Sequence, residues 1–533
     1  MRLSSRRDFL ASTALAIGAA PLTGLSRTAF QPRDGVFRHG VASGDPLADR
    51  VILWTRVTTG RPVVDVRWTV ATDPAMSRII ARGEGPTAQA RDHTVKVDVT
   101  GLSPATTYYY RFEAEGGRSP IGRTRTLRQG NASRIRLGVA SCSNYPFGYF
   151  NVYAALALRA DLDAVLHLGD YIYEYANRSF GDGTSLGRVP EPDKEMVALA
   201  DYRQRHAQYK ADPDSQEVHR QHPFIVVWDD HELTNNAWLG GAENHDPDEG
   251  EGDWFVRRNA AVQAYFEWMP IREDARALSP RIYRTLKFGD LADLILLDTR
   301  LVGRDEQAST REDIAAIESP TRSLLGRAQE GWLHGELIES KRSGTRWQVL
   351  GQQVMFAPQS EPGKPTNNPD SWDGYRASRD RVFSMIDDLK IDSFVVLTGD
   401  VHSNWAYDLP RRPFDGFDAT TGRGSVGIEF AGTSVTSRSN LGVGPDGDKQ
   451  LASIRAARPH LHYVDGRYRG YYVVDITRER LQADFYAMST IEKRTPEERF
   501  LKGYAAPAGQ MHLSEQSAPT PAPTTAPDPA PST

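Results

Sequence analysis

The sequence predicts an α/β protein in which two packed sheets are flanked by helices, preceded by a small fibronectin/Ig-like β-sandwich domain. Short alternating strands fill residues 36–128, whereas continuous apolar strands alternate with helical segments from residue 134 onward. Continuous apolar strands are typical of a sheet that is covered on both faces. At 533 residues the chain is also too long for one compact core, which favours two or three folding units.

The first residues have the pattern of an export signal. Arg6 and Arg7 precede a run of small apolar residues that reaches about Leu25. This pattern predicts a twin-arginine signal peptide over residues 1–29, recognised by the twin-arginine export machinery, and a periplasmic or secreted protein. An anchor helix would favour bulkier side chains than the alanines and glycines of residues 11–20. No later stretch of about 20 apolar residues occurs, so we expect no membrane span in the mature form.

Composition excludes several classes of protein. Lys and Arg number 64 and Asp and Glu 69, a formal net charge of −5. So weak a charge excludes a nucleic-acid binder that works by bulk electrostatics. The single cysteine, Cys142, excludes an intramolecular disulfide and a multi-cysteine zinc site.

Residues 36–128 are predicted to form the small sandwich, with strands over 51–57, 64–70 and 94–99. A turn at Leu102-Ser103-Pro104 precedes the alternating aromatic residues Tyr108, Tyr110 and Phe112. This arrangement resembles the tyrosine corner of fibronectin-type sandwiches. No catalytic cluster occurs in this region.

Residues 134–505 are predicted to form the second domain. We expect helices over 149–159, 254–268 and 376–389, and strands over 135–141, 164–168, 224–228, 293–297, 347–351, 394–397, 427–430 and 471–476. The chain then ends in a segment, 506–533, whose last 17 residues contain six prolines. Because this composition cannot form a core, we expect a disordered or extended tail.

Several predicted strands end in groups that bind cations. The strand ends carry Ser141-Cys142, Gly169-Asp170 followed by Tyr173, Asp229-Asp230-His231-Glu232 followed by Asn235 and Asn236, and Gly399-Asp400-Val401-His402. Each of these motifs alone is weak evidence for a metal site, because Gly-Asp is common in turns and acidic runs are usually exposed to solvent. In open α/β sheets the site lies outside the carboxyl ends of the strands, so the four segments should converge. Together they predict a metal site.

The residue types indicate which metals would bind. Carboxylate and amide oxygens suit hard cations such as calcium, magnesium, manganese or ferric iron. A thiolate and a phenolate, from Cys142 and Tyr173, are unusual for calcium but suit iron. A free cysteine is more often a small buried apolar residue. The serines on either side of Cys142 weaken that interpretation.

In this order the motifs resemble the alkaline phosphatase D family, the PhoD-like phosphatases. The resemblance runs from about Phe37 to Gly503 and includes the Gly40–Pro46, Leu297–Arg300 and Trp372–Tyr375 segments. It implies a β-sandwich joined to a calcineurin-like metallophosphoesterase domain, the two-sheet sandwich of that superfamily. It also implies one ferric ion, about two calcium ions, and hydrolysis of phosphate monoesters and diesters.

The resemblance also implies individual roles. Cys142, Asp170, Tyr173 and His402 would bind iron, and Asp170 would bridge to calcium. Asp400, with either Asp230 or Asn235, would complete the calcium shells. His231 would face the phosphate and protonate the leaving group. Tyr171, next to the bridging aspartate, carries no charge, so Arg300 is our candidate for contact with the substrate phosphate.

The expected chemistry is attack on phosphorus by hydroxide, because a ferric ion lowers the pKa of a bound water. A phospholipase D-like or teichoic-acid-directed phosphodiesterase of the same fold stays open as an alternative. An iron redox enzyme would need a histidine-dominated shell, whereas only His231 and His402 stand in a suitable context. A non-enzymatic surface binding protein would give no reason for four cation-binding strand ends.

Overall fold

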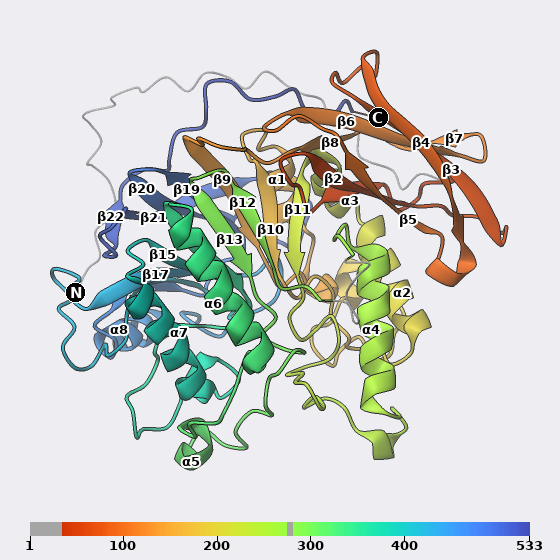
Figure 1. Cartoon of the computed structure of the whole chain (residues 1–533). Coiled ribbons are helices and arrows are strands. Elements are labelled where there is room, and N and C mark those ends of the chain that lie inside the picture. The colour runs from red at the N-terminus through yellow and green to blue at the C-terminus, as the bar shows by residue number, and fades with distance from the viewer. Residues whose placement is uncertain (1–34, 274–280, 533) are drawn as a thin grey trace, which may run out of the picture. The chain divides into compact units, whose positions relative to one another are not determined.

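The computed structural model describes residues 35–273 and 281–532 (Figure 1). The predicted signal peptide, residues 1–29, lies outside the described residues. Within these two ranges no helix combines the length and the apolar character needed to cross a membrane.

The strands of the described chain form three sheets. The first has ten strands, in the order β22 (Ser514–Gln516), β21 (Glu498–Pro507), β20 (Arg480–Met488), β19 (Gly470–Thr477), β9 (Arg134–Ala140), β10 (Ala164–Leu168), β11 (Pro223–Val227), β1 (Val41–Gly44), β2 (Arg50–Arg56) and β5 (Thr94–Thr100). The second has seven, in the order β12 (Arg284–Phe288), β13 (Ala292–Leu296), β14 (Trp347–Gln352), β15 (Phe394–Thr398), β17 (Ser425–Ala431), β16 (Asn404–Pro410) and β18 (Leu461–Asp465). The third contains β4 (Ile79–Ala88), β3 (Val63–Ala71), β6 (Thr107–Ala114) and β7 (Gly117–Arg118), with β8 (Gly122–Arg125) beside β6.

The helices divide between the two large sheets. Side chains of α1 (Asn151–Ala157), α2 (Leu199–Ala211), α3 (Pro213–Gln221) and α4 (Trp254–Trp268) join the core that surrounds β9, β10 and β11. Side chains of α6 (Gly326–Arg342) and α7 (Arg376–Leu389) pack on the seven-stranded sheet (Figure 1). The remaining helices are α5 (Ile314–Ile317) and α8 (Gly447–Ala456).

The seven-stranded sheet is covered on both faces, as its continuous apolar strands predicted. Along β15, Val395 and Leu397 join the core shared with the ten-stranded sheet, whereas Phe394 and Val396 join the core beneath α6 and α7. Successive side chains of a strand point to opposite faces, so one apolar strand serves two cores. The two-sheet sandwich flanked by helices is therefore confirmed.

The N-terminal sandwich shares a sheet with the second domain. Its two layers are the third sheet and the β1, β2 and β5 end of the ten-stranded sheet, with an apolar core between them. The expected tyrosine corner is present, because Tyr108 Oη accepts a hydrogen bond of 2.8 Å from the backbone N–H of Ser103. β1 pairs in parallel with β11, matching Gly44 to Phe224. A Cβ on Gly44 would lie 2.2 Å from the carbonyl oxygen of Pro270, so only glycine allows this approach.

The C-terminal segment, for which we expected a disordered or extended tail, is described as far as residue 532. Beyond β22 the chain runs in an irregular path along the body and ends beside the N-terminal sandwich (Figure 1). Its carbonyl groups accept hydrogen bonds from Arg134 (Pro521), Tyr109 (Asp528) and Arg220 (Pro531). Thr520 donates to Asp484 through both its backbone N–H and its hydroxyl, at 2.8 and 2.7 Å. The body thus supplies hydrogen-bond donors for a segment that has few apolar side chains to bury.

Candidate metal centre

The site lies where strands of the two large sheets end. Cys142 follows β9, Asp170 follows β10, and Asp400 and His402 follow β15. All four have positive φ angles, of 62°, 55°, 62° and 51° respectively. Residues other than glycine rarely adopt this conformation, and such strained residues gather at functional sites. The chain therefore turns sharply directly after each strand, and the turns hold the four side chains at one edge.

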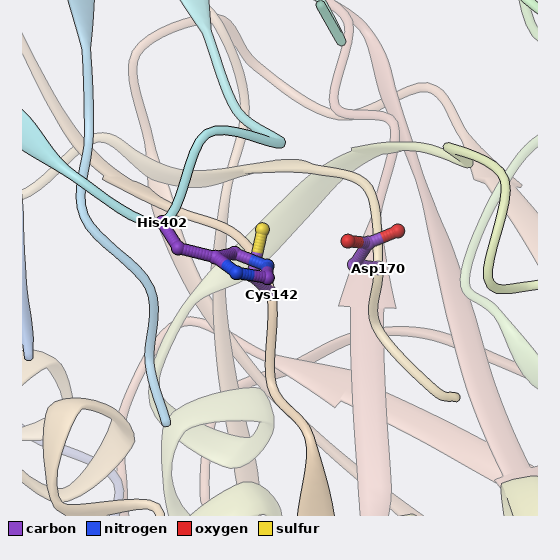
Figure 2. A group of neighbouring side chains, drawn as sticks. All are labelled: Cys142, Asp170 and His402. Atoms are coloured by element: carbon purple, nitrogen blue, oxygen red, sulfur yellow. The ribbon is translucent and has the colours of Figure 1, made fainter. Parts of the chain in front are cut away.

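The first group brings together the four residues for which iron binding was predicted. Ligand atoms of Cys142, Asp170 and His402 all lie within 4.8 Å of one another. Figure 2 shows the Cys142 sulfur beside the His402 ring, with the Asp170 carboxylate across from them. Tyr173 Oη donates a 2.9 Å hydrogen bond to Asp170 Oδ2 and lies 3.2 Å from His402 Nε2.

The His402 ring is oriented as a metal ligand would be. Its Nδ1 lies 2.9 Å from the backbone carbonyl of Arg438, which can only accept, so Nδ1 carries the proton. The unprotonated Nε2 then faces Tyr173 and the cluster. Burial, reinforced by the charge of His231, lowers the pKa of His402 to about 3. A neutral imidazole with its second nitrogen held by a carbonyl is the usual form of a metal-bound histidine.

A second group adjoins the first through Asp170. Ligand atoms of Asp170, Asp230 and His231 lie within 4.8 Å of one another. Asp230 Oδ2 accepts a 2.7 Å hydrogen bond from the backbone N–H of Asn236. The side-chain amide nitrogen of Asn235 lies instead 3.5 Å from Glu243. Of the two alternatives left open by the sequence, the structure brings Asp230 close to Asp170.

His231 is held by a residue that the sequence analysis missed. Its Nδ1 lies 2.8 Å from Glu174 Oε2, and its ring stacks on Tyr173 with 4.2 Å between the ring centroids. Burial lowers the pKa of His231, but the charges of Asp230, Glu174 and Asp170 outweigh burial and raise it well above the usual value. Glu174 directly follows Tyr173 in the sequence, and this adjacency was the one available signal.

Glu232 fastens two of the strand ends together. Its Oε1 accepts from the backbone N–H of Tyr171 at 2.6 Å, and its Oε2 accepts from Asp170 at 3.0 Å and from Asp229 at 2.8 Å. Burial raises its pKa to about 8. Glu232 belongs to the Asp229-Asp230-His231-Glu232 motif, but the sequence alone predicted no role for its side chain. Its side chain fixes the turn that presents Asp170.

The structure places Arg300, the predicted contact for substrate phosphate, among carboxylate side chains. Its guanidinium is fully buried, with Nε 2.5 Å from Asp229 Oδ1 and NH1 2.9 Å from both oxygens of Asp370. The side chain ends among carboxylates rather than at an open surface. Arg300 therefore neutralises Asp229 and Asp370, a role that depends on a residue 70 positions away in the sequence.

The donor set fits a bound cation. Asp170 Oδ1 and Asp229 Oδ2 are buried and have no hydrogen-bond partner among the described residues. Burial and the neighbouring carboxylates of Asp229 and Asp370 raise the pKa of Asp400 well above its usual value. Burial, together with the charge of Asp170, also raises the pKa of the Cys142 thiol. Buried carboxylates are stable when they are paired or when they coordinate metal, so positive charge is needed here beyond that of Arg300 and His231.

The fold and site define an α/β sandwich of two sheets that presents thiol, phenol, imidazole and carboxylate groups at one shared edge, the arrangement of a candidate metal centre. Comparison with known proteins gives the particular family. Residues 137–485 match the model of the PhoD-like phosphatases, and residues 24–128 match that of the PhoD-like phosphatase N-terminal domain. The chain belongs to the PhoD-like phosphatase family, whose members are phosphoric ester hydrolases.

Individual relatives agree with this assignment. Alkaline phosphatase D of Bacillus subtilis strain 168 is 38% identical over 471 residues, which are 85% of this chain and 77% of the relative. A solved structure described as that of PhoD has a TM-score of 0.81 and 35% identity, and the match covers 92% of this chain and 94% of that one. The expected resemblance to the alkaline phosphatase D family is confirmed.

Proposed function

We propose that this protein is an exported, metal-dependent phosphatase of the alkaline phosphatase D type that hydrolyses phosphate monoesters and diesters. The observation that carries the proposal is the convergence of Cys142, Asp170, Tyr173, Asp230 and His402 at one sheet edge. The family assignment supports a phosphate ester as the substrate.

We propose that two sets of donor side chains bind different metals. Cys142, Asp170, Tyr173 and His402 would hold one ferric ion, because thiolate and phenolate suit iron. Asp170, Asp230 and Asp400 would hold about two calcium ions, because an all-oxygen set suits a hard cation. Asp230 is preferred to Asn235 because its carboxylate lies with Asp170, whereas the Asn235 amide lies near Glu243.

When bound, these metals would supply an activated water near neutral pH and Lewis acidity toward phosphate oxygens. The chain's own contribution centres on His231. Glu174 holds Nδ1, so Nε2 is free to give a proton to the departing alcohol. Phe180, whose ring lies 6.4 Å from those of both His231 and His402, forms an apolar wall that restricts water.

Arg438 replaces Arg300 as our candidate for phosphate contact. Its side chain is exposed and its guanidinium lies 5.3 Å from the Phe147 ring centroid. Its carbonyl accepts from His402, so the residue lies directly beside the first group of ligands.

We also propose export by the twin-arginine route to the periplasm or the exterior, supported by Arg6, Arg7 and the small apolar residues that follow. This route carries folded proteins, which suits a site assembled from strand ends of two sheets.

The proposed activity is tested with p-nitrophenyl phosphate and bis-p-nitrophenyl phosphate, with metal content measured on the same sample. Both substrates should be hydrolysed. A calcium chelator should abolish turnover, and calcium should restore it better than magnesium because flexible oxygen shells suit the larger ion. Restoration by zinc or magnesium alone would reject the calcium assignment, and turnover that no chelator affects would reject metal dependence.

Replacement of the thiol tests the iron assignment. Cys142→Ser should remove visible thiolate- or phenolate-to-iron charge-transfer absorption, lower bound iron and reduce turnover by orders of magnitude. The fold should persist, because serine is nearly isosteric with cysteine. Ser141→Ala is the matched control, since it removes only the hydroxyl 3.2 Å from the sulfur. Full iron and full turnover in Cys142→Ser would leave Cys142 with a packing role alone.

A further inference from the structure

A second cluster of metal-binding side chains shares no residue with the catalytic centre. Asp408 lies on β16, His462 on β18, and His512 in the turn between β21 and β22. Ligand atoms of the three lie within 4.8 Å of one another. Asp408 Oδ2 is 2.6 Å from His512 Nδ1 and 3.1 Å from His462 Nε2. We propose that these residues form a separate site for a divalent transition ion of the zinc type.

The donor set distinguishes this site from the proposed calcium positions. Two imidazole nitrogens and one carboxylate oxygen suit zinc and its neighbours, whereas calcium and magnesium prefer oxygen alone. Three protein ligands leave a further position for water. Zinc–ligand distances of about 2.0–2.2 Å place tetrahedral ligand atoms roughly 3.3 Å apart. The observed separations of 2.6 and 3.1 Å therefore need only a small expansion.

The three side chains are already held for such a role. The Asp408 side chain is fully buried, and its second oxygen, Oδ1, accepts a 2.9 Å hydrogen bond from the backbone N–H of Leu513. That contact leaves Oδ2 directed at both histidines. His462 Nε2 is buried and makes no hydrogen bond of good geometry, although Oδ2 is near. A Cβ on Gly422 would lie 2.4 Å from the His512 Cβ, so the neighbouring loop packs tightly on this histidine.

An ion can reach the site from solvent. The side chains of His462 and His512 are 20% and 29% exposed, and His462 lines a surface pocket of about 400 Å³. Binding would displace the proton that lies between His512 Nδ1 and Asp408 Oδ2. Because β16 and β18 belong to the seven-stranded sheet and β21 and β22 to the ten-stranded sheet, the ion would link the outer edges of the two sheets.

The test uses the full-length holoenzyme with excess calcium, so that oxygen-preferring positions are filled. Titration with Co²⁺ should show one further equivalent bound, with the visible absorption of a low-coordinate Co²⁺ site, and Zn²⁺ should displace it and raise Tm. His462→Gln and His512→Gln should each weaken Zn²⁺ binding by more than the roughly 10–100-fold that loss of a supporting contact costs. Both variants should keep wild-type turnover of p-nitrophenyl phosphate.

His334→Gln is the matched control, because His334 is exposed on α6 and belongs to none of the ligand groups found among the described residues. It should bind Co²⁺ and Zn²⁺ as the wild type does. Equal Zn²⁺ affinity in the wild type and both ligand variants would overturn the proposal. So would the absence of a further Co²⁺ equivalent in the wild type, which would leave the cluster as a buried aspartate hydrogen-bonded to His512 and close to His462.

Discussion

Asp170→Asn is expected to release metal and abolish turnover together, because Asp170 belongs to both groups of ligand atoms at the candidate metal centre. Asparagine keeps the shape of the side chain but removes its charge and one of its two acceptor oxygens. The loss of turnover should exceed the roughly 10²–10³-fold that removal of one stabilising hydrogen-bond donor costs. Elemental analysis and p-nitrophenyl phosphate turnover on one preparation measure both effects.

Two features make the Asp170→Asn result interpretable. The backbone N–H of residue 170 still donates to Glu232 in the variant, so the turn after β10 should persist and circular dichroism should be unchanged. Asp182→Asn is the matched control, because Asp182 is an exposed carboxylate of the loop that follows Tyr173. A variant that lost turnover but kept every metal would show that Asp170 acts on substrate rather than on the cluster.

His231→Ala is expected to keep its metals yet lose turnover by roughly 10²–10⁴-fold, the usual contribution of a general acid. The loss should be small for p-nitrophenyl phosphate, because p-nitrophenolate leaves without a proton, and large for alkyl phosphates. Glu174→Gln should reproduce part of the alkyl-phosphate defect, because the Glu174 carboxylate orients Nδ1 and stabilises the protonated ring. Steady-state kinetics on aryl and alkyl substrates, with metal content, separate these effects.

Other roles for His231 would give different changes in turnover and metal content. Equal losses on aryl and alkyl esters would mean that the ring only positions the phosphate. Loss of metal from His231→Ala would make His231 a ligand, a role its closeness to Asp170 and Asp230 also allows. Arg300→Met is a useful contrast, since removing the cation between Asp229 and Asp370 should destabilise the fold rather than discriminate between leaving groups.

The cluster of candidate metal ligands was predictable because its residues directly follow strands. Cys142 and Asp170 follow β9 and β10, which are neighbouring parallel strands and therefore end at a common edge. Asp400 follows β15 of the seven-stranded sheet. Glu174 and Arg300 could not be assigned in this way. Their roles depend on which side-chain partners come within reach after folding, and Asp370 and Asp229 are distant in sequence from Arg300.

The two-sheet architecture was predictable from the sequence, but the contacts that connect the domains and the tail were less so. Apolar runs identified the strands of both sheets, and residues 254–268 and 376–389 are helical as expected. The contacts of the tail could not be predicted, because composition describes what a segment can bury by itself, whereas Arg134, Tyr109 and Arg220 donate to the tail from elsewhere. The pairing of β1 with β11 also had no local signal, since it joins segments about 180 residues apart.

That pairing has a consequence for how the two regions can evolve. β11 leads directly to the Asp229–Glu232 segment, and the sandwich strand β1 is its neighbour on one side. Asp45, at the end of β1, accepts a hydrogen bond from the backbone N–H of Arg272 and forms a 2.5 Å ion pair with Arg284 on β12. A one-residue slip of a strand turns every side chain to the opposite face. An insertion in β1 would thus disturb the strand beside the Asp229–Glu232 segment, so we expect the sandwich and the second domain to be inherited together.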